Sequence, residues 1–270
     1  MSDTMPAFTV MTFNVRGAHF DDGANQWLQR AALNIATIRQ HAPDLIGFQE
    51  VHPANLDAYR EHLAQYEYLV GPHYNDKEPY QHATIAWNPE RLRLVESGGF
   101  WLSLTPECYS RAWDTACTRA ATWTRLEWIE AGLTLLHLNT HLDHIGEEAR
   151  REGANVIVRQ LQQLGHAGEP IIVTGDFNCP PNSAAHRTFE EYGFADTYAA
   201  AGNHAAALTY HEFLGPAYVP TEQDDDRIDW ILLHDQQQCL NVTACDIIQD
   251  AAPPLYPSDH YPVLATFARA

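Results

Sequence analysis

The sequence predicts an α/β fold in which layers of β-sheet are flanked by helices. Apolar and β-branched runs recur along most of the chain, whereas helical periodicity appears only between some of them. Towards the C-terminus several strand-like runs follow one another with short turns between them. This order favours a layered α/β sandwich over a purely parallel sheet, in which strands and helices alternate throughout. Prolines are spread through the loops, so we expect one domain over residues 1–270.

Strand predictions rest on short runs rich in Val, Ile, Thr, Phe and Leu that are bounded by turn-forming residues. The expected strands are Phe8–Val15, Asp44–Phe48, Ala83–Trp87, Thr122–Ile129, Leu133–Leu142, Ile171–Thr174, Ile228–Leu233, Val242–Ile248 and Tyr261–Phe267.

Two segments are predicted to be helical. In the first, apolar residues recur every three or four positions from Trp27 to Ile38, which places them on one helix face. The second follows Glu147, where Ala154, Val158 and Leu161 have the same spacing. We expect this helix to stop at Leu164-Gly165, because glycine readily adopts the left-handed conformation that ends many helices.

Composition indicates an ordinary globular enzyme. The chain has 270 residues, of which 45% are hydrophobic and 19% charged, which is enough for a substantial core. No apolar run approaches the roughly 18 residues of a membrane span, so we expect no membrane insertion. The residues before Phe8 lack a basic segment followed by an apolar one, which predicts no signal peptide and a cytoplasmic location. The five cysteines are scattered and form no Cys-x-x-Cys pair, so no disulfide framework is expected.

The net charge of the chain indicates which kinds of substrate are favoured. The formal net charge is −19, from 35 acidic and 16 basic residues, and this opposes binding to a long polyanion. A small phosphorylated substrate is therefore favoured, and long nucleic acid is disfavoured. Acidic groups around metal ions and a locally positive cleft would still accommodate nucleic acid, so a nuclease is kept as the alternative. Nothing in the sequence specifies the oligomeric state.

Polar side chains stand where several predicted strands end. Asp176 and Asn178 follow the run from Ile171, while Glu50 and Asn14 end earlier runs. Near the C-terminus, Asp259-His260 adds a carboxylate and an imidazole. Each residue alone could be solvated or could cap a helix. Together, oxygen ligands suit Mg²⁺ or Mn²⁺, and an imidazole beside them suits hydrolysis of a phosphate ester.

These residues lie in motifs that span nearly the whole chain. The motifs are Thr12-Phe-Asn14, Gln49-Glu50, Asn139-Thr-His141-Leu-Asp143, Gly175-Asp-Phe-Asn178, Arg227-Ile-Asp229 and Ser258-Asp-His260. In this order they resemble the motifs of the endonuclease/exonuclease/phosphatase (DNase I-like) superfamily. Other segments, among them Phe100-Trp-Leu-Ser103, Thr140-His-Leu-Asp-His144 and His211-Glu-Phe-Leu-Gly215, are similar to a bacterial branch of it. The resemblance implies a metal-dependent phosphoric ester hydrolase. It also implies a four-layer α/β sandwich of two packed, mostly antiparallel sheets flanked by helices.

The resemblance implies metal and water-binding roles for five residues. Glu50 resembles the main Mg²⁺ or Mn²⁺ ligand, and Asn14 and Asp259 would help to hold the metal or its waters. Asp176 and Asn178 would position the attacking water close to the metal. Whether one or two metals are used stays open.

Acid–base roles are implied in the same way. His260 would pair with Asp229, which fixes the imidazole tautomer and favours the imidazolium form. His260 would then act as a general base or stabilise developing negative charge, and Asp176 is the other candidate base. His141 would donate a hydrogen bond to a nonbridging phosphate oxygen, with Asn139 beside it.

The histidines around His141 also raise the possibility of zinc. Strand alternation, however, places His137, Asn139, His141 and Asp143 on one face and His144 on the other, which disfavours a three-histidine zinc site. Asp143 either orients a neighbour or faces solvent.

Further substrate contacts are proposed from residue type. Arg111 and Arg119 are candidates for binding a distal phosphate of the substrate, because a guanidinium engages two oxygens at once; ion pairs with acidic residues are the alternative. Trp101, Trp113 and Trp123 would stack on a base or sugar ring, or belong to the core. A catalytically inactive binding module of the same fold is the other class of function. The substrate's identity, including diester or monoester, is not determined by the sequence.

Overall fold

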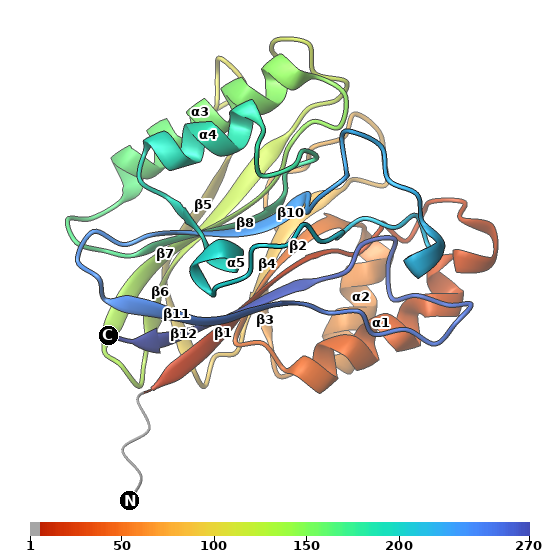
Figure 1. The fold of residues 1–270 in the computed structure, drawn as a ribbon, viewed down its shortest axis with the longest axis horizontal. Coiled ribbons are helices and arrows are strands. Elements are labelled where there is room, and N and C mark those ends of the chain that lie inside the picture. The colour runs from red at the N-terminus through yellow and green to blue at the C-terminus, as the bar shows by residue number, and fades with distance from the viewer. Residues whose placement is uncertain (1–5) are drawn as a thin grey trace, which may run out of the picture.

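The computed structural model describes residues 6–270, which form two six-stranded β-sheets packed face to face with helices on the outside (Figure 1). The first sheet contains β1 (Ala7–Asn14), β2 (Leu45–Val51), β3 (Glu67–Leu69), β4 (His82–Trp87), β11 (Leu240–Ile247) and β12 (Val263–Arg269). The second contains β5 (Leu92–Trp101), β6 (Ala120–Trp128), β7 (Leu133–His141), β8 (Ile171–Asp176), β9 (Ala195–Asp196) and β10 (Asp229–His234). Their orders are β11-β12-β1-β2-β4-β3 and β5-β6-β7-β8-β10-β9.

Most neighbouring strands are antiparallel, as expected. The parallel pairs among the described strands are β1 with β2 in the first sheet and β7 with β8 in the second. A parallel pair needs a crossover connection. Helix α1 (Trp27–His41) makes the first crossover and α3 (Glu147–Leu164) makes the second.

Three apolar cores separate four layers. Residues of both inner faces, such as Phe8, Trp128 and Ile231, fill the space between the sheets. Helices α1 and α2 (Pro53–His62) pack on the outer face of the first sheet, and α3 and α4 (Ala184–Glu191) cover the second (Figure 1). The predicted four-layer α/β sandwich is confirmed.

The local predictions were largely confirmed. Both expected helices form, but Gly165 has φ −64° and ψ 137°, so α3 ends without the left-handed residue that we expected. Strand β5 was missed because its outward residues Leu94 and Val95 are exposed and blur the apolar pattern. The other unexpected elements are β3, β9, α2, α4, the short helix α5 (Thr197–Ala200) and 3₁₀ turns at Gly23–Asn25 and Gly215–Ala217. No helix in residues 6–270 is both long and apolar enough to traverse a lipid bilayer.

The inner faces of the sheets change from apolar to polar along the strands. On β1, Phe8 and Val10 contribute to the core between the sheets, and Asn14 at the strand end has the same parity. Strand β8 repeats this order, with Ile172 in the core and Asp176 at its end. Both ends lie at the same edge of the sandwich, because the side chains of Asn14 and Asp176 are hydrogen-bonded. The candidate site residues therefore gather where the space between the sheets opens.

Candidate active site

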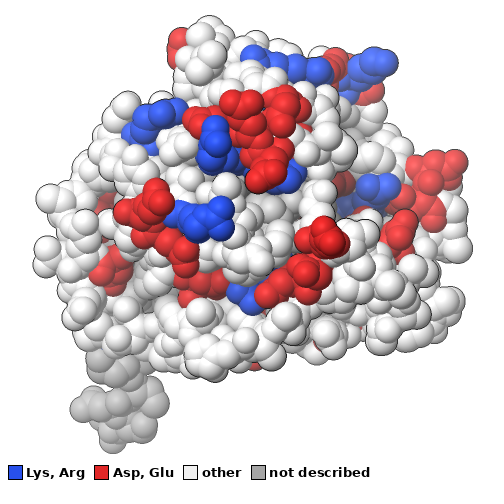
Figure 2. Space-filling model, turned by 45° about the horizontal axis from the view of Figure 1, so that its top comes forward, with Lys and Arg blue, Asp and Glu red and all other residues white. Residues whose placement is uncertain are grey.

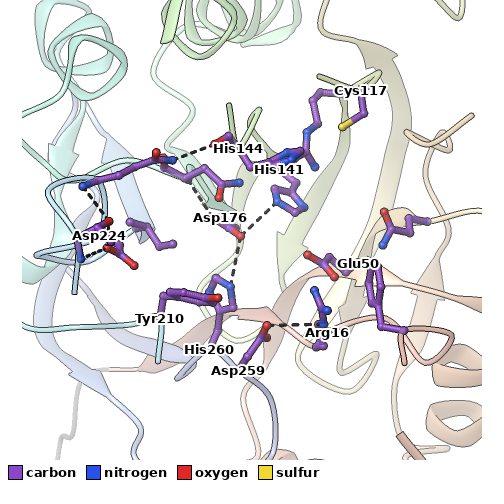
Figure 3. Close-up of a pocket in the computed structure, with 17 residues that line it drawn as sticks. Arg16, Glu50, Cys117, His141, His144, Asp176, Tyr210, Asp224, Asp259 and His260 are labelled. Atoms are coloured by element: carbon purple, nitrogen blue, oxygen red, sulfur yellow. Dashed lines mark hydrogen bonds and ion pairs between the residues drawn. The ribbon is translucent and has the colours of Figure 1, made fainter. Parts of the chain in front are cut away.

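A cleft of about 480 Å³ lies at this edge of the sandwich (Figure 3). Seven of the predicted site residues line it: Glu50, Arg119, His141, Asp176, Asn178, Asp259 and His260. They come from the ends of β2, β7 and β8, from the residue before β6 and from the loop before β12. The sandwich therefore joins residues that are far apart in the sequence.

Asp176 is at the centre of the cleft, with contacts to His141 and His260 on either side (Figure 3). Its Oδ2 accepts a hydrogen bond from Asn14 Nδ2 at 2.8 Å and lies 3.3 Å from His141 Nε2 and 3.8 Å from His260 Nε2. Its Oδ1 accepts from the backbone N–H of Asn178 at 2.9 Å. Burial, and then repulsion from Asp229, raise the pKa of Asp176 to about 7. The carboxyl group can therefore exchange a proton near neutral pH.

His260 and Asp229 form the predicted pair. His260 Nδ1 lies 2.8 Å from Asp229 Oδ2, and Asp229 is buried behind the imidazole. Burial opposes the charged form of His260, but the carboxylates of Asp229 and Asp176 outweigh it and raise the pKa of His260 to about 10. His260 is consequently an imidazolium at neutral pH, and its Nε2–H faces Asp176. Such a group stabilises negative charge better than it removes a proton from water.

Glu50 reaches the cleft through an unusual backbone conformation. Strand alternation would point it towards the helices, because its neighbour Gln49 faces Asn139 between the sheets. Instead Glu50 has φ 61°, and the pairing of β2 with β4 shifts register between Phe48 and Val51. Its carboxylate then accepts from Asn14 Nδ2 at 3.2 Å and from Gly17 N at 3.3 Å. A positive φ costs about 1–3 kcal/mol in a non-glycine residue, so its presence at a cleft is typical of functional strain.

Glu50 and Asp259 form an acidic side of the cleft that suits a divalent cation. Asp259 Oδ2 lies 3.7 Å from Arg16 Nε, and burial together with the charge of Glu50 raises the pKa of Asp259. Crowded, partly shielded carboxylates of this kind are the oxygen donors that Mg²⁺ and Mn²⁺ prefer. Ligand atoms of Asp176, Asp229 and His260 also lie within 4.8 Å of one another. In that group His260 and Asp229 are hydrogen-bonded to each other, and a charged imidazole disfavours a cation beside it, so the Glu50–Asp259 side fits a metal better.

Asn14 and Asn178 are near the acidic groups, but their amides have partners in the protein. Asn14 turns its Nδ2 towards Asp176 and Glu50, and its Oδ1 accepts from the N–H of Arg16 at 3.0 Å. Asn178 Nδ2 donates to the carbonyl of Leu142 at 3.0 Å. Asn14 thus bridges the two carboxylates as a donor, and its predicted metal contact would require the amide to turn over.

Two predicted substrate contacts lie outside the cleft. Asn139 is fully buried between the sheets, where Nδ2 donates to the carbonyls of Phe48 at 2.7 Å and Thr84 at 3.1 Å. It joins the two sheets and cannot reach a substrate, because it lies deeper along β7 than His141. Arg111 forms an ion pair with Asp76 on the surface. Arg111 is therefore paired with an acidic residue, which was the alternative to binding a phosphate, whereas Arg119 lines the cleft.

The loop after β7 differs from the strand-based expectation. His144 also lines the cleft, because strand alternation stops at His141. His137 is fully buried away from the cleft, with Nε2 2.9 Å from Thr174 Oγ1 on the neighbouring strand β8, so no three-histidine zinc site forms among the described residues. Asp143 is buried, and backbone N–H groups of Gly146 and Ile145 outweigh that burial and lower its pKa to about 2. Asp143 therefore orders its own loop.

Other cleft residues carried no sequence signal strong enough to identify them. Arg16 lies two residues after Asn14, so proximity to that motif was the one available sign. Tyr210 and Asp224 come from loops without a periodic pattern. None of Trp101, Trp113 and Trp123 is among the lining residues; Trp123 belongs to the core, and Trp113 packs against it.

Comparisons with known proteins agree with this architecture. The profile of the Endonuclease/Exonuclease/phosphatase family matches residues 11–260. No match was found among curated proteins. The structure of an endonuclease/exonuclease/phosphatase from Bacteroides vulgatus is 30% identical over 98% of this chain and 100% of that one, with a TM-score of 0.87. A mannosyl-6-phosphatase from Bacteroides thetaiotaomicron is 28% identical over 97% and 99%, also with a TM-score of 0.87. The human Nocturnin catalytic domain, 23% identical over 98% and 94% with a TM-score of 0.77, shares the fold.

Proposed function

Because this chain belongs to the endonuclease/exonuclease/phosphatase family, whose members are hydrolases acting on phosphoester bonds, we propose that it is a divalent-metal-dependent phosphoesterase acting on a small phosphorylated molecule. The observation that carries the proposal is the placement of Asp176 between His141 and the His260–Asp229 pair. Glu50 and Asp259 border the same cleft. Asp176 and His260 are the acid–base groups, and the opposite side is acidic enough to hold a cation.

In this proposal the chemistry is divided between Asp176 and His260. Asp176, with a pKa of about 7, accepts a proton from the attacking water, and Asn14 with the N–H of Asn178 holds the carboxylate in place. His260 stays protonated through Asp229 and places its Nε2–H beside the oxygen on which negative charge develops.

His141 and the acidic side act on the phosphoryl group itself. His141 is uncharged, since burial and then the positive charge of Arg119 lower its pKa, and it donates one hydrogen bond to a nonbridging oxygen. A Mg²⁺ or Mn²⁺ ion held by Glu50 and Asp259 would supply the positive charge that draws electrons from the phosphoryl oxygens.

The distribution of charge supports a small substrate. Acidic and basic side chains are interspersed on the face in Figure 2, and among the described residues there the basic ones do not join into a continuous stripe. Such a stripe is the usual feature of a surface that follows a nucleic-acid backbone. The resemblance to a mannosyl-6-phosphatase adds phosphorylated sugars to the substrates to be tried first. A monoester of a polyhydroxylated molecule is the substrate class we favour over DNA or RNA.

A panel of substrates tests the proposal. Purified protein would be assayed with p-nitrophenyl phosphate, bis-p-nitrophenyl phosphate, mannose 6-phosphate and other hexose phosphates, single-stranded DNA and RNA, each with Mg²⁺ or Mn²⁺. We expect release of phosphate from small monoesters, abolished by chelation and by Asp176→Asn. Cleavage of nucleic acid alone would favour the nuclease. Metal binding without hydrolysis of any substrate would favour a binding module.

A further inference from the structure

Arg119 is a buried arginine whose hydrogen-bonding capacity is largely unused. It is 6% exposed and lines the cleft. Among the described residues its one hydrogen bond runs from Nη2 to His144 Nδ1, at 3.1 Å, and its Nε has no partner. A guanidinium carries five N–H donors, and leaving buried donors unpaired is destabilising. A bound ligand rich in oxygen atoms would satisfy them.

The neighbouring carboxylate of Asp143 does not accept a hydrogen bond from Arg119. Arg119 Nε lies 3.8 Å from Asp143 Oδ2, which is beyond hydrogen-bonding distance. That oxygen already accepts from Thr115 Oγ1 at 2.9 Å and from Ala116 N at 3.0 Å, while Oδ1 accepts from Ile145 and Gly146. Asp143 offsets the charge of Arg119 but leaves the guanidinium donors free.

Arg119 lies near His141, the residue that we propose to bind the phosphoryl group. Its Cζ lies 5.7 Å from the centre of the Tyr74 ring, and the same ring meets His141 edge to face at 5.6 Å. The Tyr74 hydroxyl accepts a hydrogen bond from the N–H of Glu50. Arg119 and His141 are thus neighbours around one buried tyrosine.

His144 contributes a second donor. Because its Nδ1 accepts from Arg119, the neutral imidazole carries its proton on Nε2. The partial removal of the ring from water, and then the positive charge of Arg119, lower the pKa of His144, which keeps this partly exposed ring neutral. Arg119 and His144, both lining the cleft, therefore form a pair of donors, with His144 at the upper side in Figure 3.

We propose that Arg119 and His144 bind a nonbridging oxygen of a terminal phosphoryl group and thereby select phosphomonoesters over phosphodiesters. The inference rests on the proposed phosphoesterase function. A monoester presents three nonbridging oxygens with two negative charges at alkaline pH, and a diester presents two with one charge. In a diester, one position bears an ester substituent, which would leave the guanidinium buried without an anion.

A metal at this end of the cleft is the competing interpretation. Ligand atoms of Cys117, Asp143 and His144 lie within 4.8 Å of one another. The donor set is unfavourable, because both Asp143 oxygens are occupied and Arg119 brings a positive charge into contact with His144. An oxyanion fits these surroundings better than a cation.

Comparing two ester classes tests the selectivity. The kcat/KM values for p-nitrophenyl phosphate and for bis-p-nitrophenyl phosphate would be measured for Arg119→Met, Arg119→Lys and His144→Ala. We expect Arg119→Met to lower the monoester value about 100-fold or more and the diester value less than about 3-fold, since only the monoester loses a charge-assisted pair. Arg119→Lys should recover part of the loss, and His144→Ala should lower the monoester value about 10-fold.

Two controls keep the result interpretable. Arg93→Met changes an exposed, ion-paired arginine of β5 outside the cleft and should leave both values unchanged. If Arg119→Met does not fold, His144→Ala gives the same comparison, because His144 is exposed. Equal losses for both ester classes in these variants, or no loss in either, would overturn the proposed selectivity.

Equilibrium binding supplies a readout independent of turnover. Calorimetric titration with inorganic phosphate and with dimethyl phosphate, both with Mg²⁺ present, would compare the wild type with Arg119→Met. We expect the variant to lose at least about 10-fold in affinity for inorganic phosphate and little for dimethyl phosphate. Unchanged phosphate affinity would refute the role of Arg119. If the wild type bound phosphate through Arg119 but hydrolysed no ester, the function proposed above would fail while the anion site stood.

Discussion

The side-chain amide of Asn14 donates to the carboxylate of Asp176 across 162 positions of sequence, at 2.8 Å. Asn14 ends β1 of the first sheet and Asp176 ends β8 of the second, so this hydrogen bond joins the two sheets at the floor of the cleft. The same amide reaches Glu50 at 3.2 Å. One polar side chain thereby connects the carboxyl group that we assign to the water with one that we assign to the metal.

Removing the Asn14 amide should lower activity more than stability. In Asn14→Ala, Asp176 and Glu50 each lose a donor, and Asp176 is no longer held in place. We expect kcat/KM for p-nitrophenyl phosphate to fall about 100-fold, the scale of losing one preorganised donor. Asn241→Ala, an exposed asparagine on β11, is the matched control. A loss of less than about 3-fold on the same scale would contradict this role.

His260 and Asp229 should behave as a unit. Removing either member leaves the other buried without its partner, so His260→Ala and Asp229→Asn should each reduce kcat by about 100-fold or more. Because the two act together, the double variant should be no slower than the slower single variant. Steady-state kinetics of the four proteins would measure this. Losses that multiply in the double variant would show that the two residues act separately.

Divalent cations should stabilise the folded protein through Glu50 and Asp259. A ligand present at 100 times its Kd adds about 2.7 kcal/mol to the unfolding free energy, which corresponds to several degrees in Tm. Thermal melting with and without Mg²⁺ or Mn²⁺ should show this shift in the wild type and lose it in Glu50→Gln and Asp259→Asn. Glu61→Gln, on the exposed side of α2, should retain it. A full shift in both cleft variants would place the cation elsewhere.

His137 should make the protein sensitive to mild acid. Burial lowers its pKa to about 3, whereas an unfolded histidine titrates near 6.5. Between these values the unfolded chain binds a proton that the folded chain does not, so stability falls as pH decreases from about 6.5 towards 3. The contribution is about 1.4 kcal/mol per pH unit. Urea unfolding at several pH values should give a shallower slope for His137→Gln, and an identical slope would contradict the assignment.

Arg30 should be needed for the loops that carry Asn14 and Asp259. It is fully buried, and its guanidinium donates to the carbonyls of Asn25, Val15 and Pro257 at 2.9, 2.7 and 3.0 Å. We expect Arg30→Met to lower the unfolding free energy by about 3 kcal/mol or more, because these acceptors lose their donors. Arg30→Lys should recover little, because an ammonium cannot span the same carbonyls. The urea midpoint measures both, and a loss below about 1 kcal/mol would contradict this role.

Much of the layered architecture follows from local sequence patterns. The apolar runs locate most strands, and the spacing from Trp27 to Ile38 locates α1. Polar residues at strand ends, such as Glu50 and Asp176, were identified because apolar strands ending in Asp, Asn or Glu are chemically conspicuous, and His260 was identified from its Asp259-His260 pair. Residue type at a strand end is a local property, and it can be seen without knowing the neighbouring strands.

Errors arose where neighbouring strands decide the outcome. Asn139 has a polar side chain and the same strand parity as His141. It lies two residues further from the cleft along β7, however, and joins the two sheets through the carbonyls of Phe48 and Thr84. His144 was assigned to the wrong face because β7 ends at His141. Glu50 needs a left-handed backbone that no pattern of apolar residues announces.

The sequence by itself determined most of the strands, the helices α1 and α3, which of their faces are apolar, and which kinds of candidate catalytic group stand near their ends. These properties follow from side-chain chemistry and from backbone periods of two and 3.6 residues. Only the tertiary structure decided which ends meet, how deep each side chain lies and which donors stay unpaired. Those depend on packing between distant segments, as when Asn14 contacts Asp176 or when Arg119 is buried beside an Asp143 whose oxygens are already taken.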